Sequence, residues 1–190
     1  MNTDSSILLW INGHYAEWSD MLMWTVSRTA TWIPLYVLLV GLIVWKYRNW
    51  QTVLVVLIGF AVAVGLSDFV CSGVLKPLVC RLRPTHEPAL DPVHLVRGYT
   101  GGLYSFCSSH AANTMCVATL FSLLWRNKIA TASLMTWVAL VSYSRMYLAA
   151  HYPTDIIVGL LLGALFAVAV FEVLRRWLHV ADGVAQQGGS

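Results

Sequence analysis

The stretch SRMYLAAHYPTD, residues 144–155, contains residue types that carry nucleophilic and acid–base chemistry. Arg145, His151 and Asp155 lie here between two apolar runs, where charged groups are usually paired, hydrated or functional because burying them is costly. Pro153 suits the first position of a helix, which would put Asp155 in its first turn and His151 just before it. A carboxylate that accepts a hydrogen bond from one imidazole nitrogen leaves the other nitrogen unprotonated. The spacing therefore predicts a nucleophilic His151 that is oriented by Asp155.

Two further stretches supply the partners that such a nucleophile needs. Lys76, Arg83 and Arg145 would converge if the apolar segments formed one bundle, and guanidinium forks and a lysine point charge suit phosphate oxygens. In CSSHAAN, residues 107–113, two serines of N-cap type precede an apolar segment, and a helix N-terminus binds anions. His110 would lie in the first turn of that helix, where it can protonate a leaving oxygen. Together these groups predict phosphoryl transfer.

The composition predicts that lipid surrounds the elements that carry these residues. The chain has 190 residues, of which 58% are hydrophobic and 11% charged, whereas about 25% are charged in soluble domains. A membrane span needs about 20 mostly apolar residues. We expect one domain, residues 1–180, with a disordered tail at 181–190, and an all-α membrane bundle. Five segments qualify as spans: 30–47, 52–75, 109–125, 129–148 and 154–177.

The amino-terminal segment, Ser5 to Arg28, mixes apolar and polar residues, which predicts an amphipathic helix in the membrane interface. A sixth span here would place Glu17 and Asp20 near its middle. Lys and Arg are favoured on the cytoplasmic side, and three basic pairs share one side of a five-span chain. We therefore expect an integral protein of a bacterial inner membrane, with its site facing the periplasm. The pairs are Lys46 and Arg48, Arg126 and Lys128, and Arg175 and Arg176.

The three stretches together resemble the signature motifs of the type 2 phosphatidic acid phosphatases. Six residues lie between Lys76 and Arg83-Pro84, one residue lies between Ser108 and His110, and five lie between Arg145 and His151. The resemblance implies that His151 becomes a phosphohistidine with Asp155 orienting it, and that His110 protonates the leaving group and later activates water. It implies no metal and no cofactor. The phosphate would be held by Lys76, Arg83, Ser108, the N–H of Ser109, and Arg145.

One motif departs from the family pattern, because Cys107-Ser108-Ser109-His110 stands where Pro-Ser-Gly-His is usual. Serine in place of glycine is tolerable if its φ is negative, and cysteine in place of proline should loosen the start of the helix. We expect activity to survive both changes. Cys71 and Cys116 fall within apolar segments and are expected to be buried thiols. Cys80 and Cys107 fall at the outer face, where a disulfide between them is one option that spacing alone does not fix.

The loop between the first two motifs contains charged residues that match no motif. Arg81 and Arg97 are expected at the rim of the site, in contact with lipid headgroups or substrate, and GYTGGLYSF, residues 98–106, is expected to form a flexible rim. Four further residues have no metal-ligand spacing, so a solvated loop is expected there. They are His86, Glu87, Asp91 and His94.

An outward pocket level with the membrane suits a lipid whose phosphate lies at the headgroup. The expected partners are a membrane lipid phosphate and the bilayer, with no nucleic acid; no signal indicates an oligomeric state. A polyprenyl diphosphate such as undecaprenyl diphosphate is the favoured substrate, with phosphatidylglycerol phosphate, phosphatidic acid and lipid A as alternatives. Two other functions stay open: a lipid phosphotransferase, and a binder of anionic headgroups without turnover.

Overall fold

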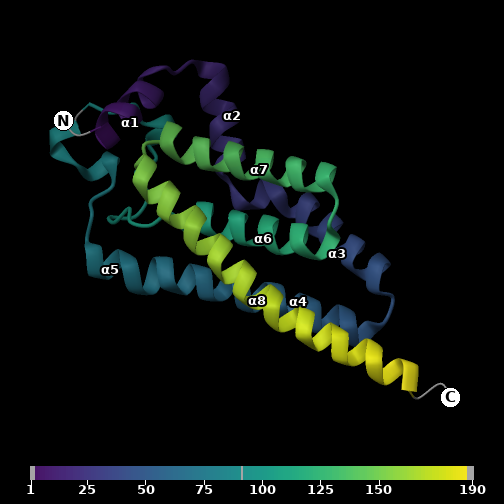
Figure 1. The fold of residues 1–190 in the computed structure, drawn as a ribbon. Helices are drawn as coiled ribbons and strands as arrows, with labels where there is room; N and C mark the ends of the chain where they lie inside the picture. Colours follow the sequence, from purple (N-terminus) through teal and green to yellow (C-terminus); the bar gives the residue numbers. More distant parts are fainter. Residues whose placement is uncertain (1–2, 91, 188–190) are drawn as a thin grey trace.

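The computed structural model describes the backbone of residues 3–90 and 92–187, and side chains as far as His179. Within these residues the chain is helical, with one isolated β-bridge between Leu82 and Tyr104 and no strand. The long helices coincide with the segments expected to span the membrane (Figure 1). They are α3 (Ile33–Tyr47), α4 (Trp50–Asp68), α6 (Ser109–Trp125), α7 (Lys128–Tyr147) and α8 (Pro153–Gln187).

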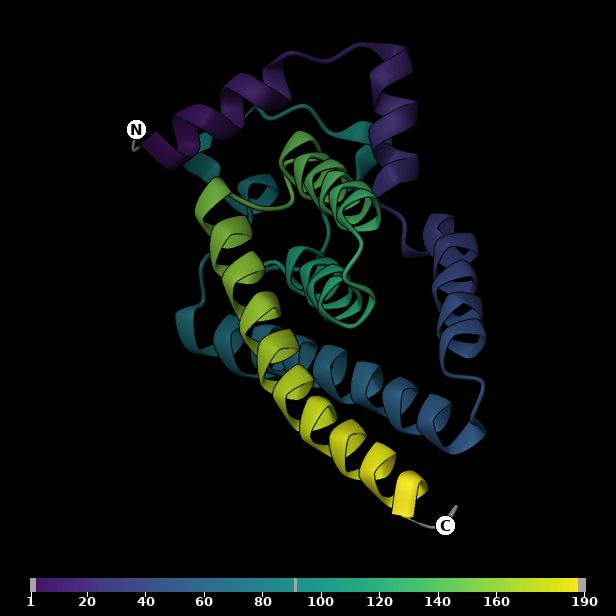
Figure 2. The same cartoon turned by 45° about the vertical axis from the view of Figure 1, so that its right-hand side comes forward.

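The helix α6 lies at the centre of the bundle, with α4, α7 and α8 around it (Figure 2). Three helical segments are long and apolar enough to cross a membrane, namely Thr29–Tyr47, Trp50–Val79 and Pro153–His179. The other two expected spans, α6 and α7, form helices but fall outside this group. Since α6 faces protein on most sides, its residues need not be apolar for contact with lipid, and it can carry polar groups into the bundle.

Two glycines let α8 approach α6 closely. Gly159 and Gly163 lie four residues apart and so share one face of α8. A Cβ atom at Gly159 would lie 2.6 Å from the carbonyl oxygen of Ser108, and one at Gly163 would overlap the carbonyl group of Ala112. Small residues at this spacing are a common means of close helix packing in membranes. The contact fixes α8, which carries Asp155, against the start of α6.

Gly163→Ala is therefore expected to destabilise the protein, because the new methyl group must displace helix backbone. Overpacking of this kind costs about 1–3 kcal/mol. The measurement is thermal unfolding in detergent. Gly65→Ala is the matched control, because a Cβ atom at Gly65 would meet nothing within 4 Å. Equal unfolding temperatures for the two variants would show that the α6–α8 contact tolerates a side chain.

The amino-terminal segment forms two helices, α1 (Thr3–Gly13) and α2 (Glu17–Ser27), rather than the single interfacial helix expected. Both pack against α7 at one end of the bundle, and α1 also contacts α8 (Figures 1 and 2). Each helix is amphipathic as expected: Leu8 and Met23 are buried, whereas Trp10 and Trp18 are exposed. The segment therefore covers the end of the bundle and does not form a sixth span.

The helix that begins at Trp50 changes its winding before it ends. After α4 a π-helical segment, Phe69–Leu75, leads into the short helix α5 (Lys76–Val79). Such π segments are frequent at functional sites. Here the wider turn places Lys76 at the end of the bundle where the other motifs lie.

The disulfide joins a different pair of cysteines from the one considered. Cys71, in the π-helical segment, is bonded to Cys107, and their Cα atoms lie 5.4 Å apart. The expected free thiol at Cys71 and the Cys80–Cys107 option are both wrong. Cys80 ends α5 with an exposed thiol that donates to the carbonyl of Pro77, whereas Cys116 is a buried free thiol as expected. The expected loosening at Cys107 is also wrong, because the disulfide ties the start of α6 to the π-helical segment.

The basic pairs gather at the opposite end of the bundle, as their spacing predicts. Lys46 donates to the carbonyl of Leu124 over 2.5 Å, and Arg126 and Arg175 line one cavity. The expected tail does not begin at a helix end, because α8 continues to Gln187. Residues 188–190 of that tail lie outside the described residues.

Candidate active site

Two buried arginines have guanidinium nitrogens that are not paired within the described residues. Arg83 follows α5, and Arg145 lies in the last turn of α7; both side chains are buried. The Nη1 atom of Arg83 and the Nε atom of Arg145 are buried without a hydrogen-bond partner among the residues that the structure describes. Unpaired buried donors are costly, most of all on charged groups. These atoms therefore indicate a site for an anion.

Tyr99 lies between the two arginines and was missed by the sequence reasoning. Its hydroxyl oxygen accepts a hydrogen bond from Nη2 of Arg145 over 2.9 Å, while Nη1 of Arg145 donates to the hydroxyl of Ser27. Burial raises the pKa of Tyr99, but the guanidinium groups of Arg145 and Arg83 outweigh it, so this pKa lies below its usual range. The segment 98–106, expected as a flexible rim, instead contacts the cations directly.

The start of α6 supplies the second set of polar groups. Ser108 caps the helix, since its hydroxyl accepts from the N–H of Ala111 over 3.4 Å. Ser109 is the first helical residue, so its φ is negative as its place in the motif requires. Its hydroxyl lies 2.8 Å from that of Ser72 and accepts from Nζ of Lys76 over 3.4 Å. Serine in place of the usual glycine thus gains a contact with the lysine of the first motif.

His151 is held by a backbone carbonyl rather than by the expected carboxylate. Its Nδ1 atom lies 2.8 Å from the carbonyl oxygen of Ser105 but 3.8 Å from Oδ2 of Asp155. The predicted hydrogen bond to Asp155 is therefore wrong. A carbonyl oxygen can only accept, so Nδ1 carries the proton and Nε2 is the free nitrogen. The outcome for the imidazole is the one expected, with Ser105 as the acceptor.

The surroundings of His151 keep it neutral. The side chain is 1% exposed. Burial lowers its pKa well below the usual value, and the nearby charges of Arg145 and Arg83 lower it further. Both causes disfavour the imidazolium ion. The Nε2 lone pair is consequently available at neutral pH, as a nucleophile requires.

Arg81 is paired with the buried carboxylate, so its expected place at the rim is wrong. Asp155 is 0% exposed, and its Oδ1 atom accepts from Nη1 of Arg81 over 2.9 Å. The Oδ2 atom of Asp155 accepts from the backbone N–H of Tyr152 over 2.9 Å, and the Arg81 guanidinium lies 3.6 Å from the Tyr152 ring centre. Arg97, by contrast, is exposed and lies over the Trp24 ring, away from Asp155.

The first helix also reaches this network. Asp4 of α1 accepts from Nη2 of Arg81 over 2.5 Å, and from the backbone N–H and the hydroxyl of Thr154 over 3.0 and 2.6 Å. The ion pairs therefore run from Asp4 through Arg81 to Asp155. The amino-terminal segment supports the residues behind His151, which its sequence alone did not indicate.

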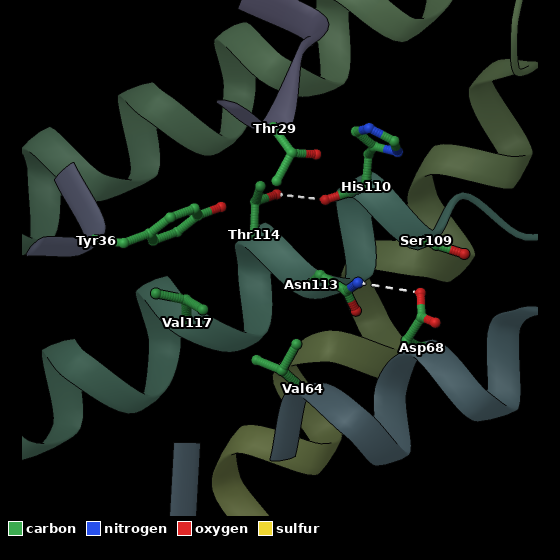
Figure 3. Close-up of a pocket in the computed structure, with 9 residues that line it drawn as sticks. All are labelled: Thr29, Tyr36, Val64, Asp68, Ser109, His110, Asn113, Thr114 and Val117. Atoms are coloured by element: carbon green, nitrogen blue, oxygen red, sulfur yellow. Dashed lines mark hydrogen bonds between the residues drawn. The ribbon is translucent and has the colours of Figure 1, made fainter. Parts of the chain in front are cut away.

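His110 lies between two cavities. One has a volume of about 430 Å³ and runs along α6 beneath His110, with Thr29 at its side (Figure 3). The other, of about 270 Å³, is lined by His110, Arg145 and Tyr99. His110 can therefore contact a bound group that extends from the two arginines into the larger cavity.

The loop residues weighed as metal ligands lie apart from this site. Nε2 of His94 lies 2.8 Å from Oδ2 of Asp20, and the His94 ring stacks on Tyr15. Asp91 falls outside the described residues. Over residues 3–90 and 92–179, whose side chains the structure describes, no three side chains of metal-binding type come together. All of the residues expected at the phosphate site, in contrast, lie at one end of the bundle.

The sequence is similar to those of known membrane phosphatases. The model of the PAP2 superfamily matches residues 53–178. The chain is 32% identical over 162 residues to the lipid A 4'-phosphatase of Bacteroides thetaiotaomicron, covering 84% of this chain and 72% of that one. It is 31% identical to the enzyme of the same name from Porphyromonas gingivalis, covering 94% and 77%. An undecaprenyl-diphosphatase of Sulfolobus acidocaldarius is 32% identical, covering 73% and 61%.

Solved structures show the same fold. Aquifex aeolicus LpxE superposes with a TM-score of 0.70 at 20% identity, covering 90% of this chain and 96% of that one. The transmembrane PAP2-type phosphatidylglycerolphosphate phosphatase of Bacillus subtilis superposes with a TM-score of 0.67 at 23% identity, covering 91% and 85%. The arrangement of helices is therefore that of transmembrane PAP2 phosphatases.

Proposed function

Because the chain belongs to the PAP2 superfamily, we propose that it is a membrane lipid phosphatase that works through a phosphohistidine on His151. The observation that carries the proposal is the hydrogen bond from Nδ1 of His151 to the Ser105 carbonyl, 2.8 Å long, beside two guanidinium groups with unpaired donors. It leaves Nε2 as the free nitrogen next to a site for an anion. Covalent catalysis by histidine needs both features.

The reaction would take place in two steps. In the first, Nε2 of His151 bonds to phosphorus while the bond from phosphorus to the leaving oxygen breaks, and His110 gives its proton to that oxygen. In the second, His110 takes a proton from water, the water oxygen bonds to phosphorus, and the bond from phosphorus to Nε2 breaks. Lys76, Arg83 and Arg145 would stabilise charge on the phosphoryl oxygens throughout. This charge comes from side chains, so the proposal includes no metal ion.

Two observations support a site that faces the periplasm. The basic pairs gather at the end opposite the site, which suits a cytoplasmic end. The Cys71–Cys107 disulfide lies at the end that carries the site. Disulfides persist in oxidising compartments such as the periplasm and are rare in the cytosol. Both observations favour the same orientation, in which the substrate phosphate lies in the outer leaflet.

Among the candidate substrates we place lipid A before the polyprenyl diphosphate that the sequence alone favoured. The two relatives named as lipid A 4'-phosphatases match 84% and 94% of the chain, whereas the undecaprenyl-diphosphatase matches 73%. The proposed activity is thus release of phosphate from a lipid phosphomonoester at the membrane surface.

The test is phosphate release by the purified protein in detergent, with EDTA present. The lipids are lipid A, phosphatidylglycerol phosphate, phosphatidic acid and undecaprenyl diphosphate. We expect turnover, with the highest kcat/KM for lipid A. Binding without turnover would overturn the proposal in favour of a headgroup binder. Transfer of phosphate to an added acceptor lipid in preference to water would instead indicate a phosphotransferase.

A further inference from the structure

The larger cavity beside His110 has polar groups that the proposed reaction does not use. The cavity follows one face of α6 from His110 past Asn113 to Val117 (Figure 3). Seven residues of helix correspond to roughly 10 Å. His110 stands at the phosphate end and is proposed to protonate the leaving oxygen. A group bound one turn further along α6 is therefore part of the leaving group, not the phosphate.

Asp68 of α4 and Asn113 of α6 meet across this cavity. Oδ1 of Asp68 accepts from Nδ2 of Asn113 over 3.1 Å, as Figure 3 shows. The Oδ1 atom of Asn113 is buried and has no hydrogen-bond partner among the described residues. A buried acceptor without a donor is costly. The pair thus presents an unpaired amide oxygen, which requires a donor, beside a carboxylate that can accept further hydrogen bonds.

We infer that Asp68 and Asn113 bind hydrogen-bond donors of the leaving group, namely hydroxyl or amide N–H groups. The inference rests on the proposed function, because it takes His110 as the end where the leaving oxygen lies. It assigns the site to the phosphomonoester of a hydroxylated or amide-bearing headgroup, such as a sugar or a glycerol. The two residues determine specificity and take no part in the proton transfers.

The same pair disfavours a lipid diphosphate. When the terminal phosphate of a diphosphate occupies the site, its second phosphate becomes the leaving group and lies next to His110. That position and the half-buried carboxylate of Asp68 border the same cavity, and like charges repel more strongly away from bulk water. A hydroxyl in the same place would donate to Asp68 instead. One carboxylate therefore favours the first class of substrate and opposes the second.

The far end of the cavity suits the apolar part of a lipid. Val64 of α4 and Val117 of α6 line it, with the Tyr36 ring of α3 opposite (Figure 3). The lining therefore changes from polar and charged near His110 and Asn113 to more apolar near Val117. A lipid with its phosphate at the start of α6 would place its headgroup at Asn113 and the first carbons of its chains at Val117.

The experiment compares three lipids: phosphatidylglycerol phosphate, its analogue without the central headgroup hydroxyl, and undecaprenyl diphosphate. For the unmodified protein we expect loss of the hydroxyl to lower kcat/KM by roughly tenfold to a hundredfold, as for a hydrogen bond to a charged group. Asp68→Asn keeps an acceptor for Asn113 and removes the charge. It should reduce the discrimination between the first two lipids to a few-fold and raise kcat/KM for the diphosphate about tenfold.

The matched control is Glu172→Gln, which removes an exposed carboxylate paired with Arg175 near the opposite end of the bundle. It should leave the ratios unchanged. Asn113→Ala is the second variant, and it should also weaken discrimination by the hydroxyl. An Asp68→Asn protein that loses activity equally on all three lipids would overturn the inference and leave Asp68 a structural role.

Recognition of the headgroup hydroxyl is also measured without turnover. The measurement is the Kd of the His151→Ala protein for phosphatidylglycerol phosphate and for its analogue without the hydroxyl. A tighter Kd for the hydroxylated lipid, lost when Asp68→Asn is added, is the expected result. Equal Kd values would overturn the inference even if the protein is a phosphatase. Absence of phosphate release from every lipid, with unequal Kd values retained, would instead overturn the proposed function alone.

Discussion

His151→Ala is expected to lower phosphate release by at least about 10³-fold, the scale of losing a nucleophile in covalent catalysis. The free Nε2 atom is the group that would bond to phosphorus, and alanine offers no replacement. Binding of a lipid phosphate should persist, because Lys76, Arg83 and Arg145 remain. The measurement is kcat for lipid A, together with rapid quenching of a radiolabelled substrate to trap a phosphoenzyme that is labile to acid and stable to base.

The matched control is His14→Ala, which removes an exposed histidine at the end of the first helix, outside the site. This variant should keep its kcat and its trapped phosphoenzyme. Substantial turnover by His151→Ala, or label on another residue of the unmodified protein, would contradict the assignment of the nucleophile.

The motif residues could be located from sequence because their spacing is local and their helices are strongly apolar. Pro153 begins α8 and Ser108 caps α6, as their residue types predict. The sequence also predicts α6 and α7 as helices. Neither of them meets both the length and the hydropathy expected of a span. Their polar residues are explained by the fold, since α6 is enclosed by other helices and α7 is partly covered by α2.

The partners that hold the motif residues could not be located in this way. Ser105 acts through its backbone carbonyl, and every residue has one, so no side-chain type marks it. Arg81 reaches the site because the chain after α5 places it between Asp4 of α1 and Asp155 of α8, and Tyr99 reaches it through Arg145 of α7. Cys71 pairs with Cys107 through an approach of two helices that spacing does not encode. The separation of Gly159 and Gly163 by four residues, by contrast, is a sequence pattern typical of close helix packing.

Arg81→Ala is expected to damage both stability and activity, contrary to the small effect that a residue at the rim would have. The substitution leaves the carboxylate of Asp155, which is 0% exposed, without its cation. Breaking a buried ion pair from one side costs about 3–5 kcal/mol, and we expect roughly the lower end because the Arg81 side chain is 25% exposed. Asp4 would lose the same partner, so α1 should also be held less firmly.

The expected effect on catalysis follows from the position of Asp155 behind His151. Without Arg81 the buried carboxylate would be protonated or would move, and the negative charge 3.8 Å from Nδ1 of His151 would be lost or displaced. That charge would favour the cationic imidazole of the proposed phosphohistidine. We therefore expect kcat to fall about tenfold to a hundredfold with a smaller change in KM, since the phosphate contacts remain. Thermal unfolding and steady-state kinetics measure the two effects separately.

Arg97→Ala is the matched control, because it removes an exposed arginine from the same loop that lies over Trp24. It should change neither the unfolding temperature nor kcat. Arg81→Lys keeps the charge but offers one ammonium group where the guanidinium bridges Asp4 and Asp155, so it should restore kcat only in part. If Arg81→Ala behaved like Arg97→Ala, the ion pair with Asp155 would carry no function, and Ser105 alone would account for the orientation of His151.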